Sequence, residues 1–225
     1  MEQWDKIFKQ YGKSYISTQD NMPKIIEFFR KNNVKMVLDL GFGTGGHMVC
    51  LVKHGFKVYG IDISEEGIKV AKKLLEENNL KADLKVGSVY KKLPYKDNFF
   101  DAIISIRVIH HAGIKDIRKL INEIKRILKP NGLIFITVRK KIPERNRLRF
   151  KLIDPRTYVP IEGDEKGVVH YLFNKELLIR EFRGFKIHGF WIDYGKKDWE
   201  LYYCLLGELK NNMTKLFTSP HTFIP

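Results

Sequence analysis

The chain has 225 residues, 44% of them hydrophobic, which suits one α/β domain with insertions and an ordinary apolar core. No apolar run approaches the roughly 18 residues of a membrane span, and the polar N-terminus is unlike a secretory signal, so neither is expected. The net charge of +15, from 41 basic against 26 acidic residues, favours anionic partners such as nucleic acid. Alternatively it reflects a lysine-rich proteome in which charge serves solubility and ion pairs.

Apolar periodicity alternates between helix and strand along the chain. Continuous apolar runs that end in turn residues are typical of buried parallel strands. Ser64 is expected to cap a helix whose first turn carries two acids, where the helix dipole favours them. The alternation predicts a doubly wound, Rossmann-like α/β sheet covered on both faces. The expected elements are helices over 19–31, 45–55, 64–75 and 114–128, and strands over 35–40, 57–64, 82–89, 100–106, 133–139, 185–193 and 200–209.

The loop after the first strand, in the stretch VLDLGFGTGG, fits two glycine-rich signatures. Three of its glycines fit the fingerprint of dinucleotide-binding enzymes, and Asp39 with three glycines fits a denser pattern, Asp-x-Gly-x-Gly-x-Gly. Asp62 ends the second strand, at the spacing where an acid takes ribose hydroxyls. The glycines of the loop are Gly41, Gly43, Gly45 and Gly46.

Two ligands that carry adenosine fit this loop, a nicotinamide dinucleotide and S-adenosylmethionine. Ligands of parallel sheets bind outside the carboxyl ends of the strands, where this loop is expected to lie. A carboxylate two residues before the turn repels a phosphate, whereas it attracts an ammonium or a sulfonium group. Asp39 therefore favours S-adenosylmethionine, and an NAD(P)-dependent oxidoreductase is kept as a rival.

Four blocks of the chain resemble the class I S-adenosylmethionine-dependent methyltransferases, over about residues 20–140. The resemblance implies methyl transfer and a seven-stranded, mostly parallel sheet with an antiparallel last strand. Phe42 replaces the usual Cys of the first block, Asn131 replaces a Gly, and Ser88 stands where many relatives carry an acid. The blocks are VLDLGFGTGG, VYGIDIS, LPYKDNFFDAIISIRVIHH and ILKPNGLIFITV.

The same resemblance implies residue roles around the cofactor. The glycines pass under the methionine and ribose, Asp39 lies near the amino group, Asp62 binds the ribose hydroxyls, and Ser88 meets the adenine. Tyr11 and Tyr15 lie where relatives often fold a lid, although a simple packed helix fits them equally well. The implied cofactor-binding residues are Asp39, Gly41, Gly43, Gly45, Asp62, Ile63, Ser88 and Tyr15.

Candidate catalytic residues follow the fourth strand. His110 and His111 end this strand at the ligand edge, where an imidazole can carry a proton, or else one packs and the other bonds a loop carbonyl. Arg107 can hold an acceptor carboxylate or phosphate with two hydrogen bonds, or face solvent. Methyl transfer from a sulfonium mainly needs alignment, so a general base is optional.

Residues 139–175 form a long connection, and such segments are usually functional or disordered. The first part is basic, from Arg139 to Lys151, and the second carries Tyr158 and His170 among aromatics. The pattern is typical of an RNA-binding loop, a cap over a small anionic substrate, or a charged solvent face. In the block FDAIISIRVIHH, and more loosely in this connection and in KKDWELYY, the chain resembles the tRNA wobble-uridine carboxymethyl methyltransferases. Tellurite-resistance and small-molecule methyltransferases resemble the core equally well.

These observations predict one methyltransferase domain over residues 1–210, with a substrate cap at about 139–175 and a loose tail over 211–225. Cys50 and Cys204 lie in apolar stretches without metal-like spacing, which predicts buried thiols in a reducing cytoplasm and no metal site. The expected function is methyl transfer from S-adenosylmethionine to a small molecule. Methylation of tRNA, or a non-catalytic S-adenosylmethionine-binding subunit, is the alternative.

Overall fold

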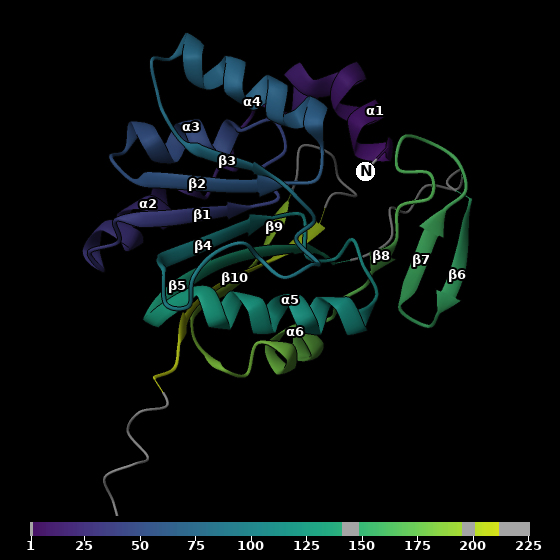
Figure 1. The fold of residues 1–225 in the computed structure, drawn as a ribbon. Coiled ribbons are helices and arrows are strands. Elements are labelled where there is room, and N and C mark those ends of the chain that lie inside the picture. Colours follow the sequence, from purple (N-terminus) through teal and green to yellow (C-terminus); the bar gives the residue numbers. More distant parts are fainter. Residues whose placement is uncertain (1, 141–148, 195–200, 212–225) are drawn as a thin grey trace, which may run out of the picture.

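A computed structural model describes residues 2–140, 149–194 and 201–211 (Figure 1). The central sheet has the strand order β3-β2-β1-β4-β5-β10-β9, in which β10 runs antiparallel to both of its neighbours. The predicted seven-stranded, mostly parallel sheet is therefore confirmed. Its strands are β1 (Met36–Leu40), β2 (Lys57–Asp62), β3 (Asp83–Val86), β4 (Phe100–Ile106), β5 (Leu128–Arg139), β9 (Phe185–Tyr194) and β10 (Leu201–Leu209).

Helices cover both faces of this sheet, as Figure 1 shows. In β1, Val37 packs with α2, α3 and α4, while its neighbour Leu38 packs on the opposite face with α5 and α6. Successive side chains of a strand point to opposite faces, so a strand buried on both faces is apolar throughout. The helices are α1 (Glu2–Tyr11), α2 (Met22–Lys31), α3 (Gly46–Lys53), α4 (Glu65–Glu77), α5 (Ile114–Ile127) and α6 (Lys175–Glu181), with a 3-10 turn at Gly12–Tyr15.

Helix ends follow their local sequence. The Ser64 hydroxyl accepts a hydrogen bond from Gly67 N at 3.0 Å and caps α4 as expected. The end of α5 differs from the prediction, because Leu128 is extended and already begins β5. The Lys-Pro-Asn-Gly stretch thus lies within β5, where the pairing with β4 shifts register and Asn131 adopts a φ of 62°.

A second, three-stranded antiparallel sheet lies within the long connection. It consists of β6 (Phe150–Asp154), β7 (Thr157–Pro160) and β8 (His170–Tyr171), in that order. The sequence did not indicate β6, because all five of its side chains are exposed and leave no buried face to alternate with a polar one. The strands β7 and β8 are mostly buried but only four and two residues long, too short for a periodic signal. None of the helices in the described part of the chain is long and apolar enough to cross a membrane.

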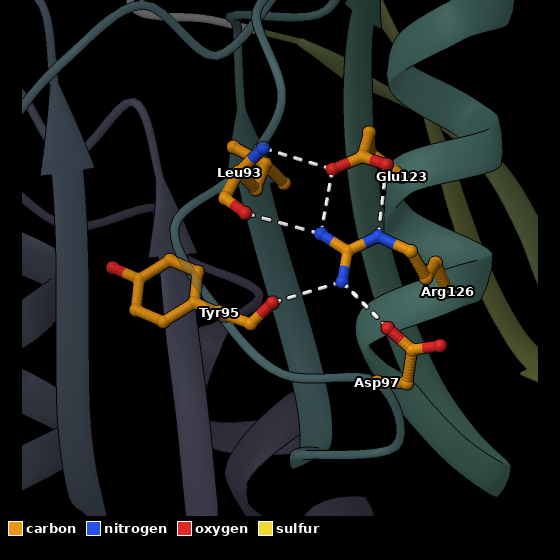
Figure 2. A network of polar contacts seen from close by, with 5 residues as sticks. All are labelled: Leu93, Tyr95, Asp97, Glu123 and Arg126. Atoms are coloured by element: carbon orange, nitrogen blue, oxygen red, sulfur yellow. Dashed lines mark hydrogen bonds and ion pairs between the residues drawn. The ribbon is translucent and has the colours of Figure 1, made fainter.

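Arg126 of α5 fastens the loop that leads into β4 (Figure 2). Its guanidinium donates to the carbonyls of Leu93 (3.0 Å) and Tyr95 (2.8 Å), to Asp97 (2.8 Å) and, through two nitrogens, to Glu123 (2.9 and 2.7 Å). The Glu123 carboxylate also accepts from Leu93 N at 2.8 Å. Five hydrogen bonds match the five N–H groups of an arginine. The network therefore fastens the loop before β4 to helix α5.

Candidate cofactor and acceptor site

The glycine loop lies at the carboxyl end of β1 and turns sharply into α3. Gly41, Gly43 and Gly45 have φ angles of 82°, 56° and 83°, which side chains rarely adopt. A β-carbon on Gly43 would lie 3.2 Å from the ring of Phe8, and one on Gly45 would lie 2.8 Å from the β-carbon of Ala71. The loop is therefore held between α1 and α4, with its backbone close to its neighbours.

Asp39 lies beside this loop in the interior of the sheet. Its side chain is buried, and its Oδ2 has no hydrogen-bond partner among the described residues, like Oγ1 of Thr44 within the loop. Burial, and secondarily the nearby Asp62, raise the pKa of the Asp39 carboxyl well above its ordinary value. Buried polar groups normally have partners. Two unpaired groups at one turn fit a polar ligand, and the Asp39 carboxyl fits the cationic groups of S-adenosylmethionine.

Asp62 ends β2 and ties the loop to α4. Its two carboxylate oxygens accept hydrogen bonds from Gly43 N and Ser64 N, each at 2.8 Å. Burial raises its pKa, although these backbone donors act against that shift. Each carboxylate oxygen has a second lone pair, so hydroxyl groups of a ribose can still donate to it.

The remaining residues implied for the cofactor are close to this edge. Ile63 follows Asp62 directly and is half-buried. Ser88 follows β3, where its hydroxyl accepts from Tyr90 N at 3.3 Å in a turn next to Gly87, whose N–H donates to Asp62 O. Tyr15 ends the 3-10 turn, and its side chain lies outside the described part.

Helix α1 packs over the same edge. Its Asp5 accepts a hydrogen bond from the Ser64 hydroxyl at 2.6 Å, and Phe8 lies over Gly43 and Gly67. Trp4 meets the ring of His111 edge-on, with centroids 5.0 Å apart. α1 therefore contacts both the residues implied for the cofactor and a candidate catalytic residue.

Arg107 adopts the left-handed region, with a φ of 62°, directly after β4. Its N–H donates to Thr137 Oγ1 at 2.9 Å, and its guanidinium lies 4.3 Å from the centroid of the Tyr202 ring. Its buried Nε has no hydrogen-bond partner among the described residues. The guanidinium of Arg139 lies 5.9 Å from the same centroid. Two cations converge on one ring, and uncommon backbone conformations of this kind cluster at functional sites.

His110 and His111 follow Arg107 in a turn, and the structure brings His170 of β8 against them. Ring centroids are 4.2 Å apart for His110 and His111 and 4.8 Å apart for His111 and His170. Burial lowers the pKa of all three: to about 3 for His111, where Arg139 adds to the effect, to about 2 for His170, and well below the ordinary value for His110. Groups with such low pKa values are neutral at pH 7 and are weak general bases.

Several residues near the candidate site were missed by the sequence reasoning. Glu165 lies 3.3 Å from His170 Nε2 and 3.8 Å from Arg139. The ring of Tyr202 lies beside the guanidinium groups of Arg107 and Arg139. His47 accepts a hydrogen bond from Gln19 N at 3.2 Å. Burial, and secondarily the nearby Arg107, lower the pKa of His47 to about 4. Tyr202 lies within KKDWELYY, whose resemblance assigned no residue a role, and Glu165 and His47 belong to no local motif.

Other features do not join this edge. A cavity of about 480 Å³ lies on β9 and β10, at the far side of the sheet order, where Phe190 and Trp191 line it. The core of the basic segment, residues 141–148, and most of the 211–225 tail lie outside the described residues, as does the first part of KKDWELYY.

The Methyltransferase domain family matches residues 38–136, from within β1 to within β5. Among curated proteins, the ubiquinone biosynthesis O-methyltransferase of Pelagibacter ubique (strain HTCC1062) is 37% identical over 109 residues, 48% of this chain and 43% of that protein. The tRNA (carboxymethyluridine(34)-5-O)-methyltransferase of Arabidopsis thaliana is 36% identical over 118 residues, 52% of this chain and 27% of that protein. The chain thus spans less than half the length of the curated relatives it matches.

Solved structures share the fold across most of the chain. The PH0226 protein of Pyrococcus horikoshii OT3 aligns with a TM-score of 0.71 at 23% identity, covering 87% of this chain and 94% of that one. The 1,6-didemethyltoxoflavin-N1-methyltransferase of Burkholderia thailandensis, solved with its substrate and S-adenosylhomocysteine, aligns with a TM-score of 0.70 at 16% identity, covering 93% and 88%. With the sheet order and the glycine loop, the match identifies residues 38–136 as a methyltransferase domain, in a fold that this chain shares with S-adenosylmethionine-dependent methyltransferases of known structure.

Proposed function

We propose that this protein transfers a methyl group from S-adenosylmethionine to a small-molecule acceptor. The observation that carries the proposal is the buried, unpaired Asp39 carboxyl beside three left-handed glycines, with Asp62 at the next strand end. Asp39 would face the cationic part of the cofactor, and Asp62 would accept from its ribose hydroxyls. Ile63 and Ser88 would flank the adenine, and Tyr15 would close over it. The cofactor supplies an electrophilic methyl group on a sulfonium.

The acceptor is proposed to carry an anionic group. Arg107 and Arg139 face the ring of Tyr202 from strand ends next to the glycine loop, and a guanidinium binds a carboxylate or phosphate through paired hydrogen bonds. His110 and His111 would orient the acceptor, since methyl transfer depends on alignment more than on a strong base. Residues 139–175 would form the cap of a single domain over 1–210. The free thiols of Cys50 and Cys204 fit a reducing compartment, the cytoplasm.

A tRNA acceptor is the second candidate. Its support is the 36% identity to the Arabidopsis tRNA methyltransferase and the exposed basic residues around β6, such as Lys151. A third reading, a non-catalytic subunit, would bind the cofactor without transferring its methyl group. The small-molecule and tRNA candidates use the same cofactor residues, so these two differ only in the acceptor.

Calorimetry and methyl transfer together test the proposal. We expect S-adenosylmethionine and S-adenosylhomocysteine to bind and NAD not to bind. Asp62→Ala should weaken the cofactor affinity by about 1–3 kcal/mol, because a charged hydrogen-bond acceptor is lost. Labelled methyl should pass to a small-molecule fraction more readily than to tRNA.

Asp101→Ala is the matched control for Asp62→Ala. Asp101 likewise accepts two backbone hydrogen bonds, from Lys35 N and Met36 N at 2.9 and 2.8 Å, but at the opposite end of β1. Both variants should lose stability, whereas only Asp62→Ala should lose affinity. Equal affinities for the two variants would contradict the ribose site, and binding without transfer to either fraction would favour the non-catalytic subunit.

A further inference from the structure

Three histidine side chains from two distant segments meet beside the candidate acceptor site. His110 and His111 lie in the turn after β4, and His170 comes from the short strand β8. Tyr171 N donates to His110 O at 2.7 Å, so a backbone hydrogen bond clamps the two segments together. Tyr158 stacks on the ring of His170, with centroids 4.8 Å apart and an interplanar angle of 13°. The cluster is therefore held by the fold and not by chance contacts of surface side chains.

Each of the three rings has one nitrogen that is available to a ligand. Nδ1 of all three histidines is buried and has no hydrogen-bond partner among the described residues. One nitrogen from each ring lies within 4.8 Å of the other two. Three imidazoles bound to one tetrahedral metal at about 2.0–2.1 Å would hold their nitrogens about 3.3 Å apart. Metal binding would therefore draw these nitrogens together by up to about 1.5 Å.

We propose that His110, His111 and His170 bind a divalent transition metal, with Zn²⁺ as the natural occupant. Three imidazole nitrogens suit Zn²⁺, Co²⁺, Ni²⁺ or Cu²⁺ and do not suit Mg²⁺ or Ca²⁺, which prefer oxygen ligands. Three protein ligands leave a fourth position open for water or an acceptor oxygen. A metal there would act as a Lewis acid toward the acceptor.

Glu165 completes the arrangement as an outer carboxylate. Its Oε2 lies 3.3 Å from His170 Nε2, which leaves Nδ1 of that ring as the ligand atom. Nε2 of His170 makes no hydrogen bond within the described part of the free protein, but metal-binding histidines commonly donate their second N–H to a carboxylate placed like this one. Arg139 opposes a cation at this place, but its guanidinium lies 3.8 Å from the same carboxylate, which offsets part of its charge.

The site goes beyond the proposed methyl transfer and does not depend on it, because metal binding is measured without cofactor or acceptor. The full chain is stripped with a chelator, loaded with Zn²⁺ or Co²⁺, and assayed for metal per chain by mass spectrometry. We expect one metal per chain, and for Co²⁺ the intense visible absorption of a tetrahedral nitrogen site. His170→Gln should lower the Zn²⁺ affinity at least tenfold, and Glu165→Gln should lower it about 10–100-fold.

His188→Gln is the matched control, since His188 pairs with Glu208 at 2.6 Å on β9 and β10, outside the cluster. It should bind Zn²⁺ as the wild type does. A wild-type chain that takes up no stoichiometric Zn²⁺ or Co²⁺ overturns the proposal, whatever the variants do. An equal loss of Zn²⁺ affinity in His170→Gln and His188→Gln also overturns the proposal, because it would place the metal outside the cluster.

Discussion

At the scale of single residues, the Asp39 carboxyl does not stabilise the folded protein in the absence of a ligand. It is buried in β1, lacks a partner at Oδ2, and has a pKa raised well above the ordinary 3.8 by burial and by Asp62. The folded state therefore binds this proton more tightly than the unfolded chain. Stability must then fall as the pH rises above the ordinary value, until the folded-state pKa is passed. A group kept against this cost is typical of a binding site.

Asp39→Asn should remove that cost. We expect its free energy of unfolding in urea to exceed that of the wild type at pH 7, with a difference that shrinks as the pH falls toward the ordinary pKa of an aspartate. Its affinity for S-adenosylmethionine should drop by about 1–3 kcal/mol, because a charge-assisted contact is lost. A variant less stable than the wild type at every pH would show that Asp39 is structural.

At the scale of elements, the loop before β4 and the turn after it are secured differently. Arg126 holds the loop through three hydrogen bonds and is itself held by two more to Glu123 of the same helix, while Tyr171 N donates to His110 O and holds the turn. Arg126 is mostly buried in this network, so its contacts are only partly screened by solvent. A lysine offers three donors from a single point and cannot span the same acceptors.

Arg126→Lys should therefore lower the free energy of unfolding by about 1–3 kcal/mol, because backbone carbonyls of Leu93 and Tyr95 lose their donors. Arg118→Lys is its control, since the Arg118 side chain is 54% exposed and makes a bidentate ion pair with Glu181, whose side chain is 9% exposed. That change should cost less than about 1 kcal/mol. Equal losses, measured by thermal and urea unfolding, would show that the Figure 2 network adds no special stability.

At the scale of the whole molecule, the net charge of +15 makes the surface attractive to any polyanion. The affinity for tRNA falls with rising salt concentration both for general attraction and for a specific site, but the two differ in which residues cause this salt dependence. A specific site concentrates phosphate contacts on a few residues. General attraction spreads them over the 41 basic residues of the chain.

Salt titration of tRNA binding separates the two. If the basic segment docks on single-stranded RNA, the log–log slope should fall by about 0.7 per phosphate contacted. Replacing Arg145, Arg147 and Arg149 with Gln should then flatten it by about two units and leave cofactor affinity unchanged. We expect parallel slopes for the wild type and the triple variant, and this result would favour the small-molecule acceptor.

The sheet and the glycine loop could be predicted because their signals are local. Strands buried on both faces are apolar runs, and Gly41, Gly43 and Gly45 supply the left-handed angles that their own turn needs. The histidine cluster could not be predicted, because His170 reaches His110 only through the pairing of β8 with a distant turn. Likewise β6 gave no strand signal, since a strand without a buried face carries no alternation.

Helix α1 touches the glycine loop through Phe8, α4 through Asp5, and His111 through Trp4, and Gln3 donates to the Asp164 carbonyl of the long connection. One ten-residue helix thus contacts the residues proposed for the cofactor, a residue proposed for the acceptor and the long connection. If those sites are as proposed, a displacement of α1 would open both of them together. We therefore expect an affinity tag at the N-terminal end of α1 to change the exchange rates of cofactor and acceptor by a similar factor.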